Sequence, residues 1–182
     1  GYSPNIAARS LVTKRTWTLG LVVTTIADPF VAEVVRGIEE TALDQGYGVI
    51  LCQSNAEPAR EIAAVRTLRE KRVDAVIVSA SRVGDLYLPL LEEIQVPIVL
   101  VNNEQSSSRV HYVLSDDFQG GRLATEYLLS LGHQRIGYIT GPAENKSSES
   151  RLRGYREALR AAGIDPHPAW IGPGNGRLHG GE

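Results

Sequence analysis

Short apolar runs alternate along the chain with longer segments in which apolar residues recur at helical spacing. The short runs predict buried strands at Leu19–Thr24, Gly48–Cys52, Ala75–Ser79, Ile98–Asn102, Val110–Leu114 and Arg135–Thr140. The longer segments predict helices at Phe30–Gln45, Glu57–Lys71, Phe118–Leu131 and Ser147–Ala162, with a short helix or turn pair at Asp85–Ile94. Strands that alternate with helices predict right-handed crossovers, and therefore an α/β fold whose parallel sheet has helices on both faces.

The residues that follow the predicted strands are mostly small or polar. They include Thr24-Thr25, Gln53-Ser54-Asn55, Ser79-Ala80-Ser81, Asn102-Asn103 and Glu144-Asn145. In open parallel sheets, ligands bind beyond the carboxyl ends of the strands, and such side chains suit hydrogen bonds to a neutral polyol or a nucleoside. Polarity at these positions is equally consistent with ordinary exposed loops.

The chain changes character after Pro166, where no periodicity is left. A second lobe that begins near Phe118 has supplied only one or two strands by that point, which is too few for a stable sheet of its own. We therefore expect a nearly complete first lobe and a second lobe that is truncated. The first residues likewise read as the end of a preceding segment, so we expect a fragment trimmed at both ends.

Composition narrows the class of protein. The 182 residues are 42% hydrophobic and 22% charged with a net charge of −2, which is typical of a soluble globular protein. The single cysteine, Cys52, excludes an internal disulfide and is expected to be a buried strand thiol. No apolar run approaches the ~20 residues of a membrane helix, and no signal peptide opens the chain, so we expect a cytoplasmic protein. The four histidines show no metal-ligand spacing, and no cofactor is expected.

Four sequence blocks carry more specific information. The first runs from Tyr2 to Leu11 and reads as a short Asn-started helix, joined by a basic linker to the first strand. The others are Ser115–Ala124, Gly132–Pro142 and Ser150–Leu159. From the chemistry of its residues alone, the second block is expected to have a structural role. Its Asp pair can cap the helix at Phe118, and Gly120-Gly121 permit close backbone approach.

Together and in this order, the four blocks resemble the lac-repressor (LacI/GalR) family of bacterial transcription regulators, up to about Ile164. The resemblance implies two lobes of the periplasmic-binding-protein type that clamp a small effector. It also implies a hinge helix that connects them to a DNA-binding helix-turn-helix. On this basis the chain divides into a hinge region at 1–15, an N-terminal lobe at 16–116 and the start of a C-terminal lobe at 117–182.

The resemblance also implies effector contacts. Arg151, three residues before Gly154, matches the arginine that hydrogen-bonds the effector in the cleft, and Ser147 lies one helical turn earlier. Arg151 could instead be a surface arginine. Asn102 lies where many relatives carry Asp, which leaves the effector class open. Asp116 is a weaker candidate, since capping alone explains it.

Two further contacts are implied in the first lobe. Phe30 matches a position where an aromatic ring commonly lines the pocket, and Asp28 belongs to the same loop. The alternative for Phe30 is packing onto the helix that follows it.

In the hinge, the resemblance implies that Leu11 is the leucine that wedges into the minor groove of operator DNA. Asn5 would cap the hinge helix, and Arg9 would contact phosphate. The basic residues Arg9, Lys14 and Arg15 precede the first acidic residue, Asp28, which concentrates positive charge at this end. The alternative is a frayed basic terminus.

These observations predict an effector-responsive regulator that binds operator DNA as a homodimer and senses a small molecule, expected to be a sugar. The main alternative is a periplasmic sugar-binding protein of a transporter, which would use the same lobes and cleft. A sugar-processing enzyme has only fold analogy behind it, since the sequence names no nucleophile or base.

Overall fold

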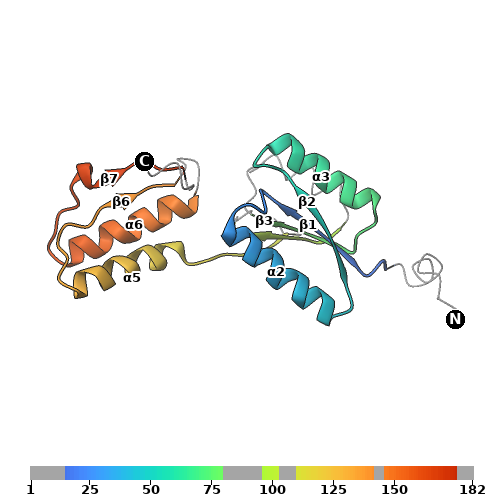
Figure 1. The fold of residues 1–182 in the computed structure, drawn as a ribbon, viewed down its shortest axis with the longest axis horizontal. Coiled ribbons are helices and arrows are strands. Elements are labelled where there is room, and N and C mark those ends of the chain that lie inside the picture. Colours follow the sequence, from blue (N-terminus) through green and yellow to red (C-terminus); the bar gives the residue numbers. More distant parts are fainter. Residues whose placement is uncertain (1–14, 80–95, 103–109, 142–145, 176–182) are drawn as a thin grey trace, which may run out of the picture. The chain divides into compact units, whose positions relative to one another are not determined.

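The computed structural model describes residues 15–79, 96–102, 110–141 and 146–175. The chain divides into two compact units, Gly1–Leu114 (unit 1) and Ser115–Glu182 (unit 2), each of which is described by itself (Figure 1). The hinge residues Asn5, Arg9 and Leu11 and the predicted helix at Asp85–Ile94 lie outside the described residues.

Unit 1 is built on a sheet of five parallel strands. In chain order these are β1 (Thr18–Val23), β2 (Gly48–Gln53), β3 (Ala75–Ser79), β4 (Ile98–Val101) and β5 (Val110–Val113). Their order across the sheet is β2-β1-β3-β4-β5, with β1 paired to β2 and β3, and β4 paired to β3 and β5. The predicted strands are confirmed to within a residue or two, and β5 forms one edge of the sheet.

Two helices cover opposite faces of this sheet. The first, α2 (Pro29–Asp44), has Pro at its first position, where a missing N–H costs nothing, and is followed by Gly46 at a φ of 76°. The second is α3 (Pro58–Glu70). Leu21 of β1 packs with α2 while the next residue, Val22, packs with α3, as the alternation of side chains along a strand requires. The predicted parallel α/β architecture is confirmed.

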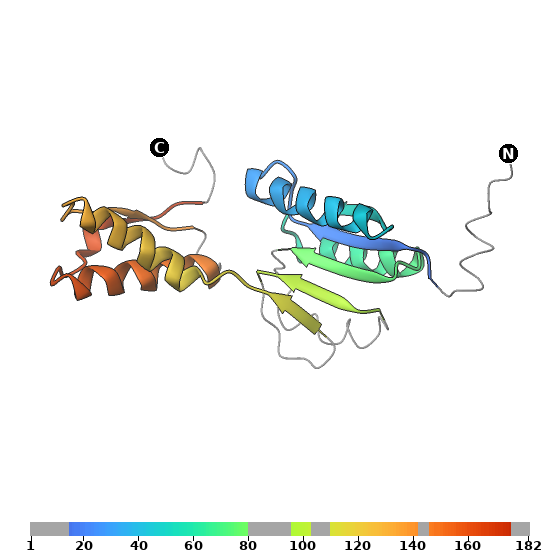
Figure 2. The same ribbon diagram turned by 90° about the horizontal axis from the view of Figure 1, so that it is seen from below.

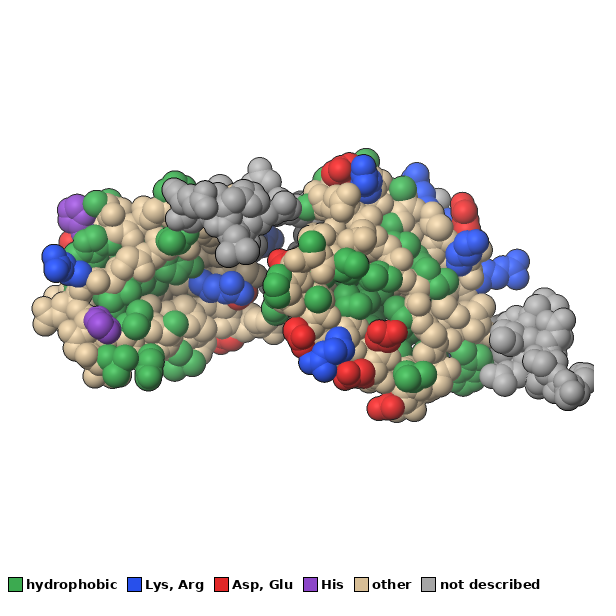
Figure 3. Space-filling view, viewed as in Figure 1, with side chains coloured by type: hydrophobic (Ala, Val, Ile, Leu, Met, Phe, Trp, Pro, Cys, Tyr) green, Lys and Arg blue, Asp and Glu red, His purple; other side chains and the backbone are tan. Residues whose placement is uncertain are grey.

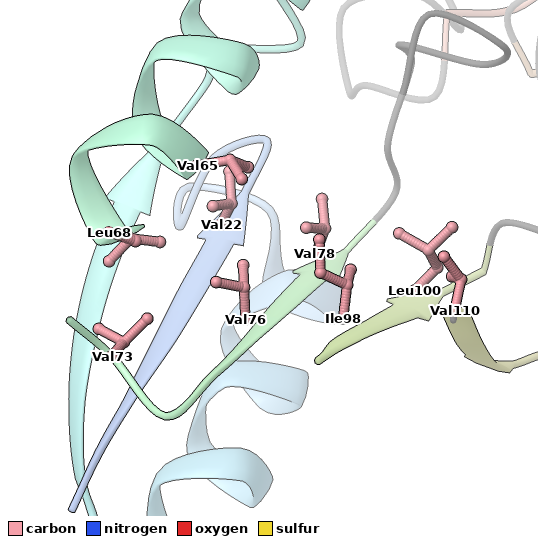
Figure 4. Close-up of a cluster of buried hydrophobic side chains, with 9 residues drawn as sticks. All are labelled: Val22, Val65, Leu68, Val73, Val76, Val78, Ile98, Leu100 and Val110. Carbon is pink, nitrogen blue, oxygen red and sulfur yellow. The ribbon is translucent and has the colours of Figure 1, made fainter. Parts of the chain in front are cut away.

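The core of unit 1 lies mainly between the sheet and α3. Figure 4 shows nine buried side chains that come from α3, the turn after it and four of the strands. They are Val22, Val65, Leu68, Val73, Val76, Val78, Ile98, Leu100 and Val110. A smaller cluster of Leu21, Val23 and Val31 fills the α2 side. Cys52 of β2 is half-buried against the larger cluster, and burial raises the pKa of its thiol.

In the described part of unit 2, the helices α5 (Asp117–Ser130) and α6 (Lys146–Ala161) lie side by side (Figure 2). Two short parallel strands, β6 (Tyr138–Ile139) and β7 (Ile171–Gly172), form a separate sheet, with the 3-10 turn η2 (Pro168–Trp170) leading into β7. Ile136, Tyr155 and Leu159 form the buried cluster of this unit.

Two expectations for unit 2 need correction. The strand predicted over Arg135–Thr140 pairs only at Tyr138–Ile139. Ile136 is buried instead as a core residue, and its carbonyl accepts a hydrogen bond from the Tyr155 hydroxyl at 2.7 Å. In addition, only one member of the Gly120-Gly121 pair makes a close approach: a Cβ at Gly120 would meet nothing within 4 Å, whereas one at Gly121 would overlap α6.

Candidate effector-binding site

The carboxyl edge of the unit 1 sheet is held in shape by polar contacts between loops. The chain after β1 is tied to the chain after β2, because the Ser54 N–H donates to the Val23 carbonyl at 2.8 Å. The Gln53 side chain accepts from the Ile26 N–H at 3.0 Å. These bonds fix the loop that carries Asp28 and Phe30.

Asp28 and Phe30 lie together at the start of α2. The Asp28 carboxylate is the N-cap of the helix and accepts from the Phe30 N–H at 2.9 Å. Phe30 keeps 54% of its surface exposed and belongs to no buried cluster of the described residues. Within that part of the chain, the packing alternative for Phe30 therefore gains no support.

Asn102 follows β4 at the same edge of the sheet. Its φ is 56°, in the left-handed region where Asn is better tolerated than most residues, and its N–H donates to the Val113 carbonyl at 2.9 Å. The backbone alone thus gives a reason for Asn at this position, independent of any ligand.

Ser79 lies at this edge and was expected only as one of several polar residues at the strand ends. It ends β3, between β1 and β4, and is 2% exposed, yet its hydroxyl has no hydrogen-bond partner among the described residues. A buried polar group of this kind is unusual. The sequence signal for this buried hydroxyl was a single Ser at the end of an otherwise aliphatic strand.

In unit 2, Arg151 lies on α6 and is held by Asp117. Its Nε and Nη2 atoms each lie 2.7 Å from the Asp117 Oδ1 atom. The Arg151 side chain is 53% exposed, whereas that of Asp117 is 11% exposed. The sequence offered Asp117 only as one of two capping carboxylates, and this partnership across 34 positions was missed.

Asp116 and Asp117 have separate roles. Asp116 is the N-cap of α5 and accepts from the Gln119 N–H at 2.9 Å, which confirms the capping prediction. Asp117 is the first residue of the helix, where the free N–H groups favour a negative charge. The effector contact proposed for Asp116 has no additional support from this geometry.

Two glycines bring α6 against the first turns of α5. A Cβ at Gly154 would lie 2.1 Å from the Phe118 carbonyl oxygen, and one at Gly121 would lie 2.1 Å from the Arg151 carbonyl oxygen. The two helix backbones are thus in direct contact beside Arg151. This contact sets the distance between Arg151 and Asp117.

Tyr138 and Ser148 lie near the same end of α6. The Tyr138 hydroxyl donates to the Ser148 carbonyl at 3.4 Å, and the Ser148 hydroxyl accepts from the Gly141 N–H at 2.8 Å. Burial raises the pKa of Tyr138, and the positive charge of Arg151 partly opposes that shift. Ser147 is half-buried, one turn before Arg151.

The described residues hold no group of three or more His, Cys, Asp and Glu side chains that could bind a metal ion. Within the same ranges, no helix is long and apolar enough to cross a membrane.

The predicted effector-binding residues fall into a unit 1 set (Asp28, Phe30 and Asn102) and a unit 2 set (Asp116, Ser147 and Arg151).

Residues 16–178 match the model of the family described as periplasmic binding proteins and the sugar-binding domain of the LacI family. The chain belongs to this family. The chain is 35% identical to the HTH-type transcriptional repressor PurR of Aliivibrio fischeri over 171 residues, which are 93% of the chain and 51% of that protein. It is 33% identical to the ribose operon repressor of Escherichia coli, over 99% of the chain and 55% of that protein.

A solved structure shows the same fold. It is that of a periplasmic binding protein/LacI transcriptional regulator from Alkaliphilus metalliredigens in complex with D-xylulofuranose. The TM-score is 0.74 at 29% identity, over 86% of the chain and 55% of that protein. The chain spans about half the length of the curated relatives it matches. These relatives are repressors, which favours a regulator over a periplasmic transport protein, and they indicate no enzymatic family.

Proposed function

We propose that the chain is the effector-sensing region of a cytoplasmic, non-enzymatic transcription regulator that binds operator DNA. The observation that carries this proposal is the family match over residues 16–178, together with repressors as relatives. The hinge would be residues 1–15, and the lobes 16–116 and 117–182. In the hinge, Asn5, Arg9 and Leu11 would contact DNA. The effector would bind between lobes, change their closure and thereby change operator affinity.

We propose a sugar, and specifically a five-carbon sugar, as the effector. One relative is named for the ribose operon, and a structural neighbour holds D-xylulofuranose. The exposed Phe30 ring offers an apolar face for a sugar ring, and Asp28, Asn102, Ser147 and Arg151 offer hydrogen bonds. Arg151 provides the most donors of this set.

Calorimetry on the protein at its full natural length tests this assignment, with D-ribose, D-xylulose, hexoses and nucleobases as ligands. Arg151→Ala should weaken binding of the sugar by about 1.5–3 kcal/mol, as expected for loss of a charge-assisted hydrogen bond. Arg151→Lys should recover little, because an ammonium cannot reproduce a two-pronged contact. Unchanged sugar affinity in Arg151→Ala would remove Arg151 from the site.

We propose that the regulator is a homodimer, as a pseudo-palindromic operator would require. β2 is an edge strand on which Leu51, on the α2 side of the sheet, is 39% exposed, and Leu43 near the end of α2 is 73% exposed. Figure 3 shows apolar side chains gathered on the visible face of unit 1, beside the charged residues of α2. A second copy would cover this face.

Sedimentation of the full-length protein tests the dimer. Leu43→Lys combined with Leu51→Lys should shift it to a monomer, while Leu123→Lys, at a 54% exposed position on α5, should not. A dimer that survives the double substitution would place the interface elsewhere.

For the DNA contact, Leu11→Ala should weaken operator binding and leave sugar affinity unchanged, since a minor-groove wedge acts on DNA deformation.

A further inference from the structure

We infer that Asp117 positions Arg151 and makes this arginine selective for the hydroxyl groups of uncharged ligands. The inference rests on the proposed function, in which Arg151 contacts the effector. It starts from the partner that the described residues provide for the Arg151 guanidinium, the Asp117 carboxylate.

The contact occupies one edge of the guanidinium. The Nε–H donates to Asp117 Oδ1 at 2.7 Å, and Nη2 lies 2.7 Å from the same oxygen in an ion pair. A guanidinium has five N–H donors in a rigid plane, and this side-on contact takes up the edge formed by Nε and Nη2. Among the described residues, no partner is recorded for Nη1, at the far end of the plane. Rotation of the planar group would break the contact with Oδ1, and the contact therefore favours one direction for the remaining donors.

Asp117 is itself held in place. Its side chain is 11% exposed, and its backbone belongs to the first turn of α5. That part of α5 packs directly against α6 through the close contacts at Gly121 and Gly154. The carboxylate therefore cannot follow Arg151 to a different position. An otherwise flexible side chain is ordered before a ligand arrives, which removes part of the entropy cost of binding.

The same contact sets the charge of the site. The Asp117 carboxylate neutralises the guanidinium locally, and a phosphate or carboxylate on a ligand would approach both groups together. Attraction to Arg151 would then be offset by repulsion from Asp117. Neutral hydroxyl groups can accept from the guanidinium N–H groups that Asp117 does not occupy, without this opposition, so the pair favours an uncharged sugar over its phosphorylated form.

The closing experiment compares the binding of D-ribose and D-ribose 5-phosphate to the full-length protein by calorimetry. The wild type should bind D-ribose the more tightly. Asp117→Asn should weaken D-ribose binding roughly two- to tenfold through loss of pre-ordering, and should move the ratio of the two affinities toward the phosphate. Asp117→Glu, which retains the charge, should keep the preference for D-ribose.

Glu126→Gln is the matched control. It removes a carboxylate that pairs with Arg122 at 2.7 Å, on the same helix but away from Arg151, and should change neither affinity. Thermal unfolding of each variant separates loss of binding from loss of folding.

The outcomes separate failure of the positioning role of Asp117 from failure of the proposed sugar site. If D-ribose binding depends on Arg151 but Asp117→Asn leaves the affinity ratio unchanged, the positioning role is overturned and the proposed function stands. A wild type that prefers D-ribose 5-phosphate also overturns it, whatever the variants do. If the wild type binds neither ligand, or Arg151→Ala binds D-ribose as well as the wild type, the proposed sugar site fails and the inference fails with it.

Discussion

The two units hold their helices in different ways. In unit 1, α3 is kept on the sheet by interlocked aliphatic side chains, such as Leu68 and Val65 against Val22 and Val76. In unit 2, α5 and α6 meet at Gly121 and Gly154, where backbone contacts backbone. The first arrangement is sensitive to the removal of side-chain volume, and the second is sensitive to its addition.

The chain provides a separate reporter for each unit. Its two tryptophans are Trp17, next to β1, and Trp170, in η2. Trp17→Phe therefore leaves a fluorescence signal from unit 2 alone, and Trp170→Phe one from unit 1 alone. Each buried cluster consists of residues from a single unit, so each substitution below should act first on the transition of its own unit.

Leu68→Ala should give the largest effect. Leu68 is fully buried, and its removal should lower the free energy of unfolding of unit 1 by about 3–4 kcal/mol, because it deletes buried methyl groups and leaves a cavity. Urea unfolding followed by Trp17 fluorescence measures this. Leu43→Ala, at a 73% exposed position, is the control and should stay within about 0.5 kcal/mol of the wild type.

A second substitution sharpens this test. A Cβ at Gly20 would lie 2.7 Å from the Leu68 Cδ1 atom, so Gly20→Ala should destabilise the wild type but be tolerated when residue 68 is Ala. Simple additivity of the two changes would contradict this account of the contact.

Gly154→Ala is the corresponding test for unit 2. The new methyl group would overlap the Phe118 carbonyl oxygen and the Arg122 nitrogen, both backbone atoms that cannot move aside cheaply. We expect a loss of about 2–3 kcal/mol, measured by Trp170 fluorescence in urea. Gly120→Ala on α5 meets nothing within 4 Å and should instead add up to about 1 kcal/mol through better helix propensity. Equal effects of the two substitutions would refute the backbone contact.

The sequence was sufficient for unit 1 because its signals are local. Apolar runs such as Leu19–Val23 and Ile98–Val101 encode buried parallel strands, and Gly46 encodes the end of α2. Unit 2 depends on contacts between distant residues, which a local pattern does not carry. Sequence periodicity could not show that Gly121, and not Gly120, meets α6.

Sequence separation also explains which contacts of the candidate site the sequence did not predict. The cap formed by Asp116 joins residues three positions apart and was predictable. The Arg151–Asp117 pair joins residues 34 positions apart and exists because Gly154 lets two backbones touch. The buried hydroxyl of Ser79 depends on the order of strands across the sheet, which places β3 at its centre.

Asp74→Ala should have a smaller effect on unit 1. The Asp74 carboxylate accepts from the Thr16 N–H at 2.8 Å and the Trp17 N–H at 3.0 Å, and so fixes the entry into β1. Losing these bonds to a charged, half-buried group should cost about 2 kcal/mol in urea unfolding of unit 1. Asp44→Ala removes the same charge at the last position of α2, where a negative charge is unfavourable, and should be neutral or slightly stabilising.

Tyr155→Phe should have the smallest effect and acts on unit 2. The tyrosine ring is 1% exposed, and its hydroxyl donates to the Ile136 carbonyl at 2.7 Å. Phe keeps the ring in the cluster but leaves that carbonyl without this donor, so we expect a loss of about 1 kcal/mol in the Trp170-monitored transition. Tyr127→Phe, on α5 with 65% of the residue exposed, removes a hydroxyl that water can replace and should change nothing measurable. A Tyr155→Phe protein as stable as Tyr127→Phe would mean that packing of the ring alone, and not the hydrogen bond, holds the chain at Ile136.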